Sequence, residues 1–205
     1  MSVFMAAYIL TDESGKEILA LSNNFLSHPY KVNAHTHHKL EISMAKSGNG
    51  TYEIGDRVYQ IRAGDIFLLG NQEPHRICLH KGQQMVNMVL HFEPEFLWSY
   101  LGQNKDIRFL NVFFSHNQKF SNRLEKENPE TQKIGTYLLE IEHEFIEKRP
   151  YYDLKIKVLM ETIFLNILRN FDYFKSSGNS LEFSHKDIYR MAEVIHYIDL
   201  NICLL

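Results

Sequence analysis

Two histidines and a glutamate stand close together in residues 35–41, which read His-Thr-His-His-Lys-Leu-Glu. Side chains alternate between the two faces of a β-strand, so His35, His37, Lys39 and Glu41 share one face if this segment is a strand. Imidazole and carboxylate groups coordinate metal ions and also hydrogen-bond polar ligands. The spacing therefore predicts a polar row that lines the inside of a small barrel.

A pocket for a small polar molecule is the first interpretation of these residues. Buried imidazoles and carboxylates are costly unless they are paired or solvated, and a ligand with hydroxyl or carboxylate groups would satisfy them. Binding pockets are mostly apolar, with a few polar groups that fix the orientation of the ligand. The residues expected to contact the ligand come from several predicted strands and turns: His35, His37, Glu41, Phe67, His75 and Asn87.

Two other interpretations stay open for the same residues. His35, His37 and Glu41 form a two-histidine, one-carboxylate set of the kind that holds non-haem iron(II), although a bound metal is not the main expectation. Alternatively, the histidines lie on a partly exposed strand end. Glu41 would then only pair with Arg62 or Lys39, and a surface pair of this kind contributes little stability.

Composition limits the class of protein. The 205 residues suffice for one substantial core, and the net charge of −3 argues against a nucleic-acid-binding surface over the whole chain. The two cysteines suggest no disulfide framework, and no apolar run is long enough to cross a bilayer. We therefore expect a cytoplasmic protein without membrane contacts.

The first 92 residues have the pattern of short strands and turns. Residues 48–50 (Gly-Asn-Gly) predict a turn, residues 55–56 (Gly-Asp) a tight hairpin, and residues 63–65 another turn. Residues 66–69 and 85–92 predict strands, the second with Asn87, Val89 and His91 on one face. Many short strands at this spacing indicate a barrel or a sandwich.

The pattern then changes to helices. Residues 131–148 predict an amphipathic helix, and residues 153–174 a second helix whose apolar residues occupy more than one stripe, so that a single packing surface cannot cover them. A polar linker and a third helix from about Ser184 follow. The apolar stripe of the first helix is a candidate dimer interface with these members: Ile134, Tyr137, Leu138, Ile141 and Phe145.

Several of these residues also fit a family pattern. His35, His37, Glu41 and Gly48 resemble the first motif of the cupin superfamily, with Pro29 in place of the usual leading glycine. Gly55, Gly64 and Asn71 resemble the second motif. That motif here has Arg62 in place of its proline and Phe67 in place of the histidine that would be the last metal ligand.

More narrowly, the chain resembles the N-terminal domain of AraC/XylS-type transcription regulators. The resemblance lies in residues 62–69, in Pro74 and His75, and in residues 90–94 (Leu-His-Phe-Glu-Pro). It implies a mainly β fold, in which a cupin (jelly-roll) barrel is followed by an amphipathic two-helix dimerisation segment. The expected division is an effector-binding barrel at 1–128, helices at 129–175, a linker at 176–183, and the first helix of a helix-turn-helix DNA-binding domain at 184–205.

The resemblance also implies a function. We expect the effector-sensing and dimerising portion of a regulator that is not an enzyme and has no cofactor. Its partners would be a small-molecule effector, a second copy of the chain, and DNA only through a C-terminal domain beyond this chain. Two alternatives remain: a metal-dependent cupin oxygenase or isomerase that uses His35, His37 and Glu41, and a plain dimerisation module whose barrel is filled by its own side chains.

Overall fold

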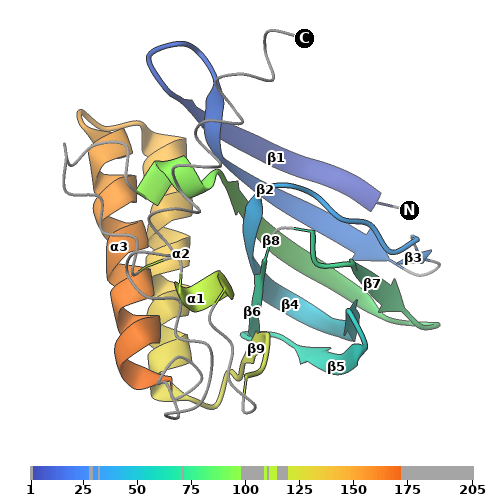
Figure 1. The fold of residues 1–205 in the computed structure, drawn as a ribbon. Coiled ribbons are helices and arrows are strands. Elements are labelled where there is room, and N and C mark those ends of the chain that lie inside the picture. The colour runs from blue at the N-terminus through green and yellow to red at the C-terminus, as the bar shows by residue number, and fades with distance from the viewer. Residues whose placement is uncertain are drawn as a thin grey trace, which may run out of the picture.

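The computed structural model describes residues 2–27, 30–31, 33–70, 72–97, 109, 111–114 and 120–171. Within them, strands make up the first part of the chain, and two long helices lie side by side along one side of the strands (Figure 1). The predicted linker and the helix expected from Ser184 lie outside the described residues.

The elements follow one another with short connections. The strands are β1 (Ser2–Thr11), β2 (Glu17–Ser27), β3 (Tyr30–Lys31), β4 (Leu40–Ile54), β5 (Arg57–Arg62), β6 (Ile66–Leu69), β7 (His75–Leu79), β8 (Gln84–Phe92) and β9 (Arg123–Leu124). The helices are η1 (Pro94–Leu97), α1 (Asn111–Phe114), α2 (Pro129–Glu147) and α3 (Tyr152–Asn170).

The long strand β4 joins the two layers of the barrel. Its first part pairs with β8 and β6, and its second part pairs with β5 and β7, all antiparallel. A bulge between Ala45 and Ser47 and a positive φ of 82° at Gly48 bend the strand between these parts. The predicted turn at residues 48–50 is therefore wrong, because the glycines bend one continuous strand. The hairpin at 55–56 is confirmed, since Ile54 pairs with Arg57.

The two faces of β4 serve different purposes. Leu40, Ile42 and Met44 belong to a hydrophobic core that also contains the buried faces of α2 and α3. Ala45 belongs to a second apolar cluster inside the barrel, and Glu41, on the same face as Ala45, is buried there with 3% of its surface exposed. Because side chains alternate along a strand, one face of β4 holds the helices and the other carries the candidate site.

Helix α2 begins and ends with recognisable caps. The side chain of Asn128 accepts a hydrogen bond from the amide of Glu130, Pro129 occupies the first turn, and Lys148 ends the helix in the left-handed region with a φ of 49°. The expected helix at 131–148 is thereby confirmed to within two residues at its start. The second helix starts one residue before the predicted Asp153.

The predicted dimer stripe of α2 lies inside the chain itself. The side chains of Ile134, Leu138, Ile141 and Phe145 are at most 1% exposed, and Tyr137 packs partly buried against the same core. The barrel covers this stripe, so these four buried side chains are not available to a second chain. Helix α3 needs more than one packing surface, as expected: Ile163 is fully buried, whereas Leu154 is 55% exposed.

Together these features confirm the predicted fold class, a mainly antiparallel cupin barrel followed by two helices. In the part of the chain that is described, no helix has the length and apolar character needed to cross a membrane.

Candidate functional site

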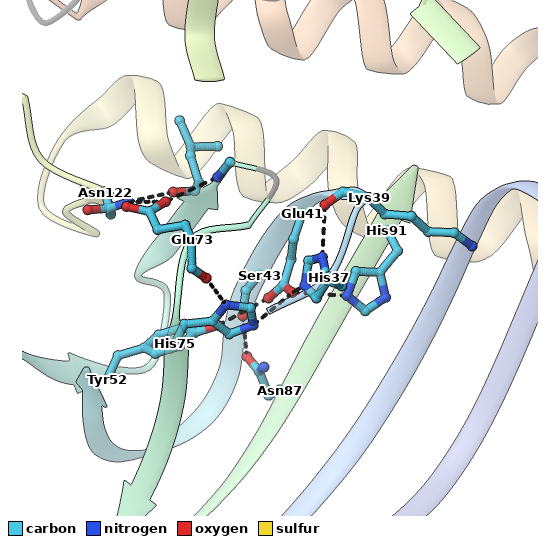
Figure 2. A network of polar contacts seen from close by, with 12 residues as sticks. His37, Lys39, Glu41, Ser43, Tyr52, Glu73, His75, Asn87, His91 and Asn122 are labelled. Atoms are coloured by element: carbon cyan, nitrogen blue, oxygen red, sulfur yellow. Dashed lines mark hydrogen bonds and ion pairs between the residues drawn. The ribbon is translucent and has the colours of Figure 1, made fainter. Parts of the chain in front are cut away.

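Glu41 is the centre of a cluster of imidazoles at one end of the barrel (Figure 2). Its Oε2 lies 3.0 Å from Nε2 of His37, 2.9 Å from Nε2 of His91 and 3.6 Å from Nε2 of His75. The other carboxylate oxygen accepts a hydrogen bond from the Tyr52 hydroxyl over 3.1 Å. A buried carboxylate is thus paired on both oxygens, as burial of a charge requires.

The three imidazoles come from different parts of the fold. His91 lies on β8, directly opposite Glu41 in the antiparallel register. His37 precedes β4 in a segment that is not a strand. His75 begins β7 and is held by a β-bridge to His35, with main-chain hydrogen bonds of 3.1 and 3.0 Å. Residues far apart in the sequence therefore converge because β4, β7 and β8 meet at this end of the barrel.

Main-chain carbonyls fix the orientation of two of these rings. Nδ1 of His37 lies 2.8 Å from the oxygen of Lys39, and Nδ1 of His75 lies 2.8 Å from the oxygen of Glu73. A carbonyl oxygen only accepts, so each Nδ1 carries a hydrogen and each Nε2 faces Glu41. In His37 both nitrogens then donate to oxygen acceptors, which requires the charged imidazolium.

Electrostatics agree with this assignment. The hydrogen bond from Glu41 raises the pKa of His37. Burial alone would raise the pKa of Glu41, but hydrogen bonds from His37 and His91 and the charge of nearby imidazoles hold it well below its usual range. Burial, followed by the charge of Glu41, raises the pKa of Tyr52 well above its ordinary value, so this hydroxyl stays a donor. The cluster thus contains a carboxylate anion and an imidazolium at neutral pH.

The cluster is open to solvent on one side only. The side chains of His37 and His91 are 22% and 33% exposed, whereas those of His75 and Glu41 are each 4% exposed. A molecule that approaches from solvent therefore meets His37 and His91 first, with Glu41 and His75 behind them.

Deeper in the barrel, the remaining predicted ligand-binding residues are packed. Asn87 accepts a hydrogen bond from the Ser43 hydroxyl over 3.1 Å and is 4% exposed. Phe67 is 1% exposed, and its ring centre lies 4.8 Å from that of Tyr52. Apolar side chains thus fill part of the barrel interior, and Phe67 supports Tyr52 from below the polar cluster.

The predicted row of side chains on one strand is correct only in part. His37 and Glu41 meet, but Lys39 turns away and pairs with Glu17, and residues 33–39 do not form a regular strand. His35 is exposed, with its ring centre 4.4 Å from that of His75. The alternative in which Glu41 pairs with Arg62 or Lys39 is wrong, because its partners are histidines and Tyr52 and because Arg62 pairs with Glu127.

Two histidines have a different role from the one expected. The predicted strand face of Asn87, Val89 and His91 is confirmed, yet His91 was not among the expected ligand contacts, and its shared face with Asn87 was the available signal. Phe67 was expected to replace the last metal ligand. In the fold it packs on Tyr52, and His75 instead brings a ring nitrogen to the cluster.

The cluster also fits a metal ion. One ligand atom from each of His37, Glu41 and His91 lies within 4.8 Å of the others, which suits a two-histidine, one-carboxylate set. Histidines that bind metals usually donate their second ring hydrogen to a carbonyl or carboxylate, as His37 does to Lys39. This set differs from the predicted one by His91 in place of His35.

Comparisons with known proteins agree with the fold. A family model described as the AraC-like ligand binding domain matches residues 19–163. No curated protein matches the chain at a significant level.

Solved structures similar to this one share limited sequence identity. AerE from Microcystis aeruginosa is 21% identical over 37% of this chain and 39% of its own, with a TM-score of 0.34. A cupin protein from Bacteroides fragilis is 21% identical over 43% and 75%, with a TM-score of 0.36. The polyketide cyclase RemF from Streptomyces resistomycificus is 19% identical over 42% and 63%, with a TM-score of 0.37. The chain thus spans less than two thirds of the length of AerE and RemF.

Proposed function

Because the chain belongs to the family of AraC-like ligand-binding domains, we propose that it is the effector-sensing and dimerising portion of a bacterial transcription regulator. The effector is a small polar molecule of the cytoplasm that binds at the imidazole cluster around Glu41. DNA is contacted only through a C-terminal domain that would follow this chain.

The observation that carries the proposal is the half-open imidazole cluster itself. Partly exposed His37 and His91 stand in front of a buried carboxylate at the end of a barrel whose interior is partly filled by apolar side chains. A ligand that enters can hydrogen-bond the exposed rings and compete for Glu41, while apolar walls contribute contact area. This combination suits recognition of hydroxyl or carboxylate groups.

Binding can regulate only if the effector prefers one arrangement of the chain. His37 is the part of the site that can change most readily, because it lies outside the strand ladder and is held by bonds to Lys39 and Glu41. A ligand that takes over the bond to Glu41 would release His37 and the segment before β4. That release would be the differential interaction that shifts the position of the attached DNA-binding domain.

A thermal-shift screen tests the proposal. The 205-residue chain is exposed to a panel of sugars, polyols and small carboxylic acids, and at least one class should raise the unfolding temperature. The shift should disappear in His91→Ala and persist in His38→Ala, whose exposed ring hydrogen-bonds Gln72 outside the cluster. A panel without any shift, or equal shifts in both variants, would refute effector binding at this site.

Dimerisation is the second part of the proposal. The exposed apolar side chains of α3 are Leu154 (55%), Val158 (49%) and Leu165 (40%), and their spacing of four and seven residues forms one stripe along the helix. These residues, and not the buried stripe of α2, would face a second copy. Two copies would place two DNA-binding domains on paired half-sites.

A metal-dependent cupin enzyme, an oxygenase or isomerase, is the second candidate function, and the convergence of His37, Glu41 and His91 favours it. A bound ion would supply Lewis-acid chemistry at the barrel mouth. Metal analysis of protein purified without chelator, followed by zinc titration of His91→Ala and His35→Ala, decides between the candidates. Stoichiometric metal that depends on His91 and not on His35 supports the enzyme, and protein without metal affinity removes it.

A further inference from the structure

A second set of polar contacts joins the candidate site to the segment that leads into α2 (Figure 2). His75 donates from Nδ1 to the main-chain oxygen of Glu73, and the Glu73 carboxylate accepts from Nδ2 of Asn122, which lies 3.1 Å from both of its oxygens. Asn122 directly precedes β9, and the chain then enters α2 at Pro129. One residue, Glu73, therefore contacts both the site and the start of the helical part.

Asn122 is held tightly at its end of this chain of contacts. It is fully buried, and its Nδ2 also donates to the main-chain oxygen of Leu68 over 3.0 Å. Its Oδ1 accepts from the Tyr59 hydroxyl at 3.2 Å and from Arg57 at 3.4 Å. A buried amide whose donors and acceptor are all paired resists displacement, because each lost bond leaves an unsatisfied polar group.

Glu73 is fixed at two points as well. Its Oε2 accepts from the amide of Gly70 over 3.1 Å, which ties the carboxylate to the end of β6. Its main-chain oxygen orients the His75 ring. The connection between β6 and β7 therefore moves as one unit with the His75 ring and with Asn122.

We propose that Glu73 and Asn122 are positioning residues that couple His75 in the candidate site to the segment entering α2. The inference rests on the proposed function, because effector binding at Glu41 would use this coupling to reach the helices. A ring displaced from Glu41 pulls on the Glu73 carbonyl, and the Glu73 carboxylate passes that displacement to Asn122. The proposal names the path by which site and helices share one equilibrium.

A double-mutant cycle tests the coupling without any effector. His75 and Asn122 contact Glu73 and have no printed contact with each other, and independent sites have additive effects on stability. The loss in urea midpoint caused by His75→Leu should shrink by at least half in the Asn122→Ala background. The matched control is Ser43→Ala, which lies in the same barrel but contacts Asn87, and it should remain additive with Asn122→Ala.

A third substitution locates the path. In a Glu73→Ala background the non-additivity of His75→Leu and Asn122→Ala should vanish, whereas Glu73→Gln, which keeps one acceptor oxygen for Asn122, should restore part of it. Hydrogen exchange gives a second measurement if the double variant does not fold. His75→Leu should speed amide exchange in residues 122–128, and Ser43→Ala should not.

Additive midpoints together with unchanged exchange in residues 122–128 would overturn the coupling. That result would leave effector binding at Glu41 intact, since the thermal-shift screen tests binding separately. Conversely, an effector panel without any hit would refute the proposed function while leaving a measured non-additivity in place.

Discussion

Glu41 and His91 stand opposite each other in the antiparallel pairing of β4 with β8, and Nε2 of His91 lies 2.9 Å from Oε2 of Glu41. Directly opposed residues share a sheet face, so the strand register alone brings these two side chains together. His37 reaches the same oxygen from a segment outside the strands. One side of the site is therefore held by the β-ladder and the other by side-chain hydrogen bonds, which makes His37 the adjustable partner.

Removal of the Glu41 carboxylate should destabilise the fold strongly. Glu41→Ala leaves the His37 imidazolium and the Tyr52 hydroxyl without their buried acceptor, a loss of about 3 kcal/mol in the free energy of unfolding. Urea denaturation at pH 6 measures it. Lys133→Ala is the control, because that lysine is largely exposed and pairs only with Glu130, and it should have little effect. Similar midpoints for both variants would contradict the central role of Glu41.

The His37–Glu41 pair should confer a pH-dependent stability with two limits. The pKa of Glu41 is lowered in the folded chain, so its contribution is present above its ordinary value of 4.5 and is lost as the pH falls. The pKa of His37 is raised, so its contribution is fully present below its ordinary value of 6.5 and is lost as the pH rises through the raised value. The pair should therefore stabilise the chain most between about pH 4.5 and 6.5.

Urea midpoints from pH 4 to pH 9 check this dependence. The midpoint of His37→Gln should differ from that of the unmodified chain most in this window, and the difference should shrink toward pH 9. His38→Gln, one residue away but bonded to Gln72, should show no such profile. A difference for His37→Gln that grows with pH would show that His37 is neutral in the fold.

Much of the fold follows from patterns along the sequence. Alternation and turn residues located β6, β8 and the hairpin at Gly55, because each strand has one face in a core. The family motif and the alternation also pointed to His37, Glu41 and His75 as site residues. These parts depend on local geometry or on spacing, and the sequence contains both.

The remaining features depend on how the strands pair in space. Gly48 has the residue type of a turn, yet pairing of β4 with β8 on one side and with β5 on the other keeps the chain extended through it. His91 joins the site through a cross-strand register that periodicity does not determine. The stripe from Ile134 to Phe145 on α2 is equally apolar whether the barrel or a second chain covers it, so burial decided its role.

Substitution of Gly48 should separate a steric effect from backbone strain. Gly48 has a φ of 82°, and an added Cβ would lie 1.8 Å from the main-chain oxygen of Gln84 on the neighbouring chain segment. Gly15 has nearly the same φ of 83° but open space around the added atom. Gly15→Ala should cost about 1 kcal/mol from strain alone, whereas Gly48→Ala must also separate β4 from the start of β8 and should cost clearly more. Equal losses in thermal unfolding would show that the bend adjusts freely.

Charged substitutions on α3 should distinguish its two faces. Val158→Glu places a charge on the exposed stripe with Leu154 and Leu165, so the proposed dimer should dissociate while the unfolding midpoint of the monomer stays nearly constant. Ile163→Ala on the buried face should instead cost about 2–5 kcal/mol, because it leaves a cavity in the core shared with the barrel. Sedimentation velocity and urea denaturation measure the two effects. If Val158→Glu lowers stability and leaves the oligomeric state unchanged, the exposed stripe is covered by the chain itself rather than by a second copy.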